Sequence, residues 1–176
     1  MRFIDKHNNN LLTLEDQEEA LTRSEWSYYF AKAKIPGSDF KALQAKAWED
    51  PYYAYLFAKF ILGVDIKYCQ ENACKDPYLA YYFARHIPGL DIKYYQEQAC
   101  KDPECAYYFA KFIPGADIKY CQEYACKELG LALVFATDIP GADKKYCFKH
   151  AFPEDEYGPD RWKSEYNKFI MKKACE

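Results

Sequence analysis

Cysteine is the residue of this chain with the widest chemistry, because thiolates bind metals, form disulfides and act as nucleophiles. Six of the eight cysteines form two sets that repeat every 26 residues: Cys74, Cys100 and Cys126, and Cys69, Cys121 and Cys147. Packed helices lie about 8 to 10 Å apart, whereas the Cα atoms of a disulfide lie within about 7 Å. We therefore predict free thiols that pack as small hydrophobic side chains. Cys100 and Cys105 flank a tight turn and are the one pair that could approach each other.

Metal ligands and catalytic histidines are sparse in the sequence. Only Cys147 and His150 have the spacing of a Cys/His ligand pair, and no CxxC pair occurs. His86 occupies a position that Phe60 and Phe112 fill elsewhere, which indicates a packing role. Gly-rich phosphate loops, GxSxG and HExxH are also missing from the sequence. We predict no metal site and no cofactor, and we do not expect an enzyme.

A repeat of 26 residues must position these side chains. Residues 81–94 read YYFARHIPGLDIKY and residues 107–120 read YYFAKFIPGADIKY, so 11 of 14 letters agree. The motif Gly-x-Asp recurs with the same 26-residue step at Gly37, Gly63, Gly89, Gly115 and Gly141. Five units therefore run from about residue 24 to residue 152, and the first carries one extra residue.

Each unit is predicted to contain two short helices, named A and B. In the third unit Asp76 is an N-cap and Pro77 opens helix A, a start that Asp50-Pro51 and Asp102-Pro103 repeat. The apolar stripe of this helix A consists of Ala80, Phe83, Ala84 and Ile87. Pro88 and Gly89 end helix A. Asp91 then caps helix B, whose inward stripe is Ile92, Tyr95 and Ala99. The fifth unit departs from this pattern, with Glu128-Leu129-Gly130 in place of the Asp-Pro start.

Helices of this length are too short to be stable alone in water, but stacked pairs can bury a continuous core. We predict an all-α fold, a short right-handed α-solenoid of five two-helix repeats with N- and C-terminal capping helices. Residues 1–23 form the N-terminal segment with a capping helix over 11–23, and residues 24–152 form the array. Residues 153–176 form a linker and a C-terminal helix over 159–174, with Trp162, Tyr166, Phe169 and Ile170 on one face.

The composition narrows the classes of protein. Net charge is −3, which argues against a partner held chiefly through phosphate contacts. Charges in the first ten residues are atypical of a signal peptide, and no apolar run approaches the length of a membrane span. We expect a soluble, cytoplasmic protein with no membrane partner.

Tyrosine is heavily used, with 18 residues in a chain of 176. The outward arc of the A helices is predicted to carry Tyr52, Lys59, Tyr78, Tyr82, Arg85, Tyr108 and Lys111. Helix B offers a second row, Tyr68, Tyr94, Tyr120 and Tyr146, each preceded by a lysine. Tyr and Arg are favoured at binding hot spots, so we predict that these residues bind another protein. The alternative is that some of these rings only fill seams between units.

Two further hypotheses use the same rows of side chains. Tyrosine rings could stack on the bases of a single-stranded nucleic acid while lysines meet its phosphates. Against this, residues 50–127 hold nine Lys or Arg and ten Asp or Glu, and acidic side chains would repel a phosphate backbone. In the other hypothesis, exposed rows pair two copies of the chain in a homo-oligomer.

The unit DPxxAYxFAxxIPGADIKYxQExA resembles two-helix repeats of uncharacterised proteins from bacteriophages and large DNA viruses. The likeness covers about residues 50–147 and is most specific around FAxxIPGxD. It departs from the pattern in the first unit and at Glu128-Leu129-Gly130. The resemblance implies no activity and no functional residue. It does imply a viral origin, in which case the expected role is to bind and inhibit a host or defence factor in the host cytoplasm.

Overall fold

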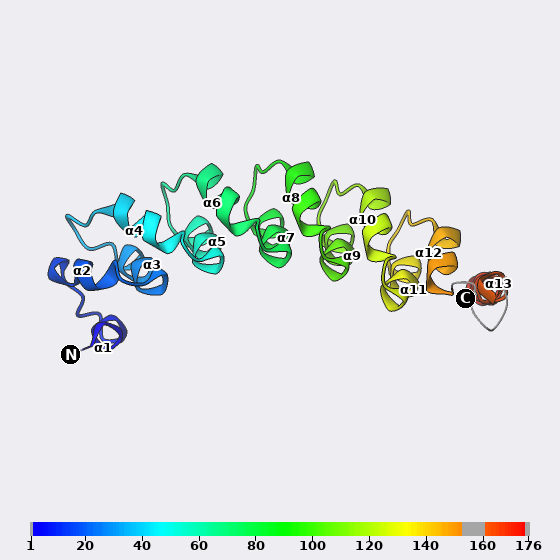
Figure 1. Ribbon diagram of the computed structural model, residues 1–176, viewed down its shortest axis with the longest axis horizontal. Helices are drawn as coiled ribbons and strands as arrows, with labels where there is room; N and C mark the ends of the chain where they lie inside the picture. Colours follow the sequence, from blue (N-terminus) through cyan, green and yellow to red (C-terminus); the bar gives the residue numbers. More distant parts are fainter. Residues whose placement is uncertain (1, 153–160, 175–176) are drawn as a thin grey trace. The chain divides into compact units, whose positions relative to one another are not determined.

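The computed structural model describes residues 2–152 and 161–174, without the side chains of residues 68, 69, 72, 162, 170, 173 and 174. Throughout these ranges all regular secondary structure is helical (Figure 1), which confirms the predicted all-α fold of stacked helix pairs. Among the described residues, no helix combines the length and the apolar character that a membrane crossing requires.

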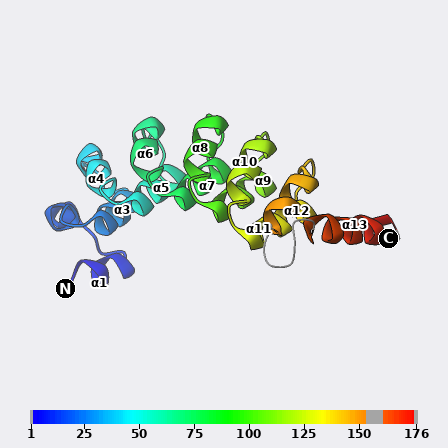
Figure 2. The ribbon, with the colours of Figure 1, turned by 45° about the vertical axis from the view of Figure 1, so that its right-hand side comes forward.

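The chain forms two compact units, each of which contains several of the 26-residue repeats. The first unit is Met1–Gly89 and the second unit is Leu90–Glu176. The first contains α1 (Phe3–Asn8), the 3₁₀ turn η1 (Leu14–Asp16), α2 (Gln17–Ala20), α3 (Ser24–Ala33), α4 (Phe40–Ala47), α5 (Pro51–Phe60), α6 (Ile66–Ala73) and α7 (Pro77–His86). Within it, α3 packs against α4 and α5 against α6, as an A helix against a B helix. The A helices α3, α5 and α7 also pack side by side as one layer (Figures 1 and 2).

The second unit has the same construction. It contains α8 (Ile92–Ala99), α9 (Pro103–Phe112), α10 (Ile118–Ala125), α11 (Leu129–Asp138), α12 (Lys144–Ala151) and α13 (Arg161–Ala174). The A helices α9 and α11 pack against each other, and each packs against its own B helix, α10 or α12. The C-terminal helix α13 packs against α12, the last B helix (Figure 1).

The A helices begin where the Asp-Pro dipeptides predict. The side chains of Asp50, Asp76 and Asp102 each accept a hydrogen bond from a first-turn N–H, at 2.9 to 3.0 Å for the shortest contact. The following proline occupies the first turn, where its missing N–H costs nothing. In α11 the N-cap is Glu128, whose side chain makes no capping hydrogen bond. A cap of the Asp type contributes about 1 kcal/mol, so α11 depends more on packing than α5, α7 and α9 do.

Helix A ends because its last apolar residue turns extended. Ile87 has φ −113° and ψ 116°, as disfavoured helical geometry before Pro88 predicts. Gly89 then adopts φ +78°, a left-handed conformation that is strained for residues with a Cβ atom. Two residues later the Asp91 side chain accepts from the N–H groups of Lys93 and Tyr94 and starts helix B.

Phenylalanine dominates the buried stripe of the A helices. Phe30, Phe57 and Phe83 in the first unit and Phe109 and Phe135 in the second all have 0% of their surface exposed. Burial of such a side chain stabilises the fold by roughly 1.5 to 3 kcal/mol. The predicted core position is therefore the same in every A helix.

The N-terminal segment differs from the prediction of one capping helix over residues 11–23. The structure instead has the unpredicted helix α1, followed by η1 and the short α2. Phe3, Asn10 and Ala20 each lie 27 residues before an equivalent repeat residue, namely Phe30, Gly37 and Ala47. Phe3 and Ala20 are fully buried, and Asn10 adopts φ +55° where the repeats have glycine. Residues 3–20 thus have the landmarks of a shortened repeat.

The described cysteines pack as predicted, and two pairs of them lie in contact. Among the described residues, six cysteines are buried thiols outside any disulfide: Cys74, Cys100, Cys105, Cys121, Cys126 and Cys147. Contacts join the two sets: Cys100 Sγ lies 3.8 Å from Cys121 Sγ, and Cys126 Sγ lies 3.6 Å from Cys147 Sγ. The contact with Cys100, followed by burial, raises the pKa of the Cys121 thiol. A thiol that stays protonated is a poor nucleophile and metal ligand.

Candidate protein-binding surface

Buried tyrosines recur at one position of four A helices, and within each unit they line the seam between adjacent A helices. Tyr28, Tyr55, Tyr81 and Tyr107 occupy equivalent positions and are only 3 to 6% exposed. The cation four residues further along each helix lies 5.0 to 5.7 Å from the ring centroid: Lys32, Lys59, Arg85 and Lys111. Lys59 and Lys111 also donate to the hydroxyls of Tyr55 and Tyr107, at 2.9 and 2.6 Å, and Arg85 donates to Tyr81. The predicted binding residues Lys59, Arg85 and Lys111 therefore have partners within their own helices.

In the first unit the seam is closed by a neutral ring. The Tyr55 hydroxyl lies 3.1 Å from Nδ1 of His86, which stands on the next A helix. Tyr82 stacks on His86 with centroids 5.8 Å apart and contacts the Tyr55 ring at 6.0 Å. Desolvation, reinforced by the charge of Lys59, lowers the pKa of His86 and favours the neutral imidazole.

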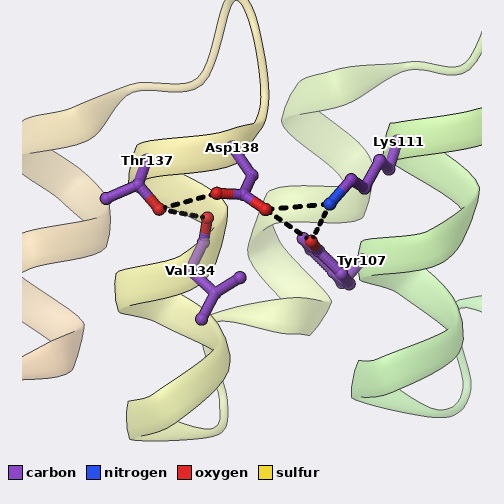
Figure 3. A network of polar contacts seen from close by, with 5 residues as sticks. All are labelled: Tyr107, Lys111, Val134, Thr137 and Asp138. Carbon is purple, nitrogen blue, oxygen red and sulfur yellow. Dashed lines mark hydrogen bonds and ion pairs between the residues drawn. The ribbon is translucent and has the colours of Figure 1, made fainter.

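In the second unit a carboxylate closes the equivalent seam (Figure 3). Tyr107 donates to Asp138 Oδ2 at 2.8 Å, and Lys111 Nζ lies 2.8 Å from the same oxygen. Thr137 donates to Asp138 Oδ1 at 3.0 Å. The hydrogen bond from Lys111, followed by those from Tyr107 and Thr137, lowers the pKa of Asp138 to about 2. The same bond to Asp138 raises the pKa of Lys111.

Among the described side chains of the first unit, three tyrosines are exposed, and we call Tyr52, Tyr78 and Tyr82 the tyrosine surface. Tyr52 is 52% exposed, and Tyr78 and Tyr82 are each 40% exposed. Tyr52 and Tyr78 are equivalent residues of the adjacent helices α5 and α7, and Tyr82 lies one turn after Tyr78. All three were predicted to lie on the outward arc of the A helices. In the structure they are exposed on two A helices that pack against each other, α5 and α7.

The other predicted tyrosines are more enclosed. Tyr108 is half-buried, and its hydroxyl donates to Glu104, the residue that replaces Tyr78 in the second unit. In helix B, Tyr94 contacts Tyr95 at 5.4 Å, Tyr120 donates to Tyr124, and Tyr146 stacks on His150 at 4.2 Å. The hydrogen bond with Tyr124 raises the pKa of Tyr120. The side chain of Tyr68 lies outside the described residues.

Buried glutamines are positioning residues that the sequence motifs did not single out. Gln96 accepts from the backbone N–H of Asp117 and donates to its carbonyl, both at 2.9 Å. Gln122 accepts from the N–H of Asp143 at 2.8 Å, 21 residues further along. These amides clamp the loop that precedes the next B helix. Glutamine recurs at positions 44, 70, 96 and 122, and a polar residue repeated in four packed B helices was the available signal.

The last repeat replaces this clamp by an apolar contact. Phe148 occupies the glutamine position of α12 and is 2% exposed. Its ring lies 5.5 Å from Tyr166 and 5.3 Å from Phe169, both on α13. Tyr166 and Phe169 thus lie on one face of the C-terminal helix, as predicted. Residues 153–160, which include the predicted linker and the first two residues of the predicted C-terminal helix, lie outside the described residues, as do the side chains of Trp162 and Ile170.

Within the described residues, no group of three or more His, Cys, Asp or Glu side chains is arranged to hold a metal ion. Cys147 contacts Cys126, and His150 stacks on Tyr146 while its Nδ1 lies 3.1 Å from the Tyr146 carbonyl oxygen. The comparisons with protein-family models, curated proteins and solved structures give no match for this chain.

Proposed function

We propose that this protein is a non-catalytic binding module and that the tyrosine surface contacts a partner protein. The observation that carries the proposal is the exposure of Tyr52, Tyr78 and Tyr82 on two adjacent A helices. A core-filling role predicts the low exposure of Tyr55 and Tyr81, which are 6% and 4% exposed in the same two helices.

The surroundings of these rings suit protein recognition. Tyr82 is held by stacking on His86 and by its contact with Tyr55, so ordering this ring on binding costs little side-chain entropy. Tyrosine offers a large apolar area together with a hydroxyl that can hydrogen-bond. The resemblance to viral repeats extends the proposal to the kind of partner. The partner would be a host or defence factor, and this chain would inhibit it by binding.

Affinity capture with matched variants tests the proposed surface. Tyr52, Tyr78 and Tyr82 are replaced together by Ala, while a control variant carries Tyr108→Ala in the second unit. The proposal predicts that wild type and control retain one partner and that the triple variant loses at least about tenfold in affinity. The triple variant should keep the helical circular dichroism of wild type, with a modest fall in melting temperature because the Tyr82 ring packs on His86 and Tyr55.

Two outcomes contradict the proposal. Equal retention of the partner by the triple variant would move the binding surface elsewhere. Retention of nucleic acid instead of protein, with an affinity that falls steeply as salt rises, would favour the single-stranded nucleic-acid hypothesis.

A further inference from the structure

Helix α11 is the last A helix, and it exposes several apolar side chains. Its sequence from residue 129 to residue 137 is LGLALVFAT, without a charged side chain. Leu129 is 57% exposed, Leu133 38% and Val134 39%. Leu129 and Leu133 lie four residues apart and therefore share one face of the helix. An end repeat ordinarily presents a polar outer face, so this apolar face indicates an interface.

The equivalent face of the preceding A helix is covered. Tyr107 is equivalent to Leu133 and is 6% exposed, because α11 supplies Phe135 and Asp138 against it. Lys111, which pairs with Asp138, is replaced in α11 by Thr137. The face of α11 thus continues the interface between A helices. It lacks the tyrosine hydroxyl and the lysine cation that bind Asp138 in the preceding helix pair.

The occupant that fits this face is a second uncharged A helix. If two copies stacked head to tail, α11 of one copy would contact α3 of the other, on the side of α3 that faces the N-terminal segment. That face is occupied by Phe3, which is fully buried and stacks on Trp26 at 5.1 Å and Phe30 at 6.5 Å. A two-fold arrangement avoids this obstacle, because each copy then contributes the same face.

We propose that two copies of the chain associate through α11, helix against helix about a two-fold axis near Leu133. Leucine meets leucine in this arrangement, and no charge of residues 129–137 is buried. The proposal is independent of the tyrosine surface, which belongs to the first unit. A contact built on three side chains per copy predicts a weak dimer, with a dissociation constant of about 10 to 100 µM.

Sedimentation velocity from about 1 µM to about 500 µM tests this proposal, since that range brackets the expected dissociation constant. The sedimentation coefficient of the wild type should rise with concentration. Leu133→Glu and Leu133→Lys should each remain monomeric, because like charges would face each other across the axis. An equimolar mixture of the two variants should recover the dimer. Leu62→Glu is the matched control, since Leu62 is 87% exposed in the first unit, and it should behave as wild type.

Each alternative result overturns the proposal. A wild type that stays monomeric over the whole range removes it directly and needs no variant. Dimerisation of Leu133→Glu equal to wild type would place the contact on another surface. Failure of the mixture to dimerise would show that the face binds something other than itself. Should Leu133→Glu lose its helical circular dichroism, Leu129→Glu at the more exposed end of the stripe replaces it in the same comparison.

Discussion

The two units build their A helices on the same plan but present different outer surfaces. The first exposes Tyr52, Tyr78 and Tyr82, and it closes the seam between α5 and α7 with His86. The second has Glu104 in place of Tyr78 and closes the seam between α9 and α11 with Asp138. Its last A helix is uncharged over nine residues, 129–137.

This difference separates what the repeat needs from what it leaves open. Phe, Ala and the left-handed Gly recur at inward or turn positions, because any change there would disturb packing or backbone geometry. Outward positions tolerate Tyr, Glu, Leu or Val at equivalent places. Function is therefore expected where equivalent repeats diverge, and stability where they agree.

The largest predicted effect concerns the inward position. Phe57→Ala in the first unit and Phe109→Ala in the second should each lower the free energy of unfolding by about 3 to 5 kcal/mol. Both rings are fully buried, whereas the control residue Phe60 is 52% exposed. Urea unfolding measures these losses. A small loss at one of the two positions would show that the units are not built alike.

The glutamine clamp should have the next largest effect. Gln122→Leu leaves the N–H of Asp143 without its acceptor, which should cost about 1 to 3 kcal/mol. Glu123→Leu, the exposed neighbouring position in α10, is the matched control and should be close to neutral. Equal unfolding free energies for the two variants would mean that the clamp contributes little.

The charged seam of the second unit should respond to acid. Asp138 has a pKa of about 2 in the folded protein, below its ordinary 3.8, so its stabilising contribution is present above pH 3.8 and disappears as the pH falls to about 2. Asp138→Asn should therefore be less stable than wild type near neutral pH and equal to it near pH 2. Lys111 and Asp138 are 34% and 37% exposed, so added salt should reduce the difference. A difference that does not vary with pH would contradict this assignment.

The neutral seam of the first unit should give the smallest effect, in a different pH window. The folded pKa of His86 lies below the ordinary 6.5, so the unfolded chain binds the proton more readily and wild-type stability falls as the pH drops below 6.5. His86→Phe places at this position the residue found at Phe60 and Phe112, and it should remove this part of the pH dependence. His7 and His150 are present in both proteins and cancel in the comparison. Identical pH profiles would contradict the account of the seam.

Most of the fold follows from the sequence, because the signals are local and repeated. Asp-Pro starts, Pro-Gly ends and the Phe stripe act within a few residues, so the A helices begin and end where these signals predict. Helix α1 was missed because its single buried contact residue, Phe3, stands in a polar segment. Phe3 aligns with Phe30 of the first full repeat only if the step is 27 residues and not 26.

The binding surface was less predictable than the fold. Helical periodicity places Lys59 and Lys111 on an outward arc, but it does not show that tyrosine hydroxyls hold their ammonium groups. Gln122 contacts Asp143 and Cys100 contacts Cys121, so each contact joins residues 21 positions apart in two successive repeats. Such contacts depend on how adjacent repeats stack, which a 26-residue sequence period does not reveal.

Hydrogen exchange on the captured complex is the most direct test of the central claim that the exposed tyrosines of the first unit carry the function. Partner binding should slow exchange of backbone amides in α5 and α7, while α9 and α10 should keep the rates of the free protein. Protection confined to α8–α13, with α5 and α7 unchanged, would contradict it.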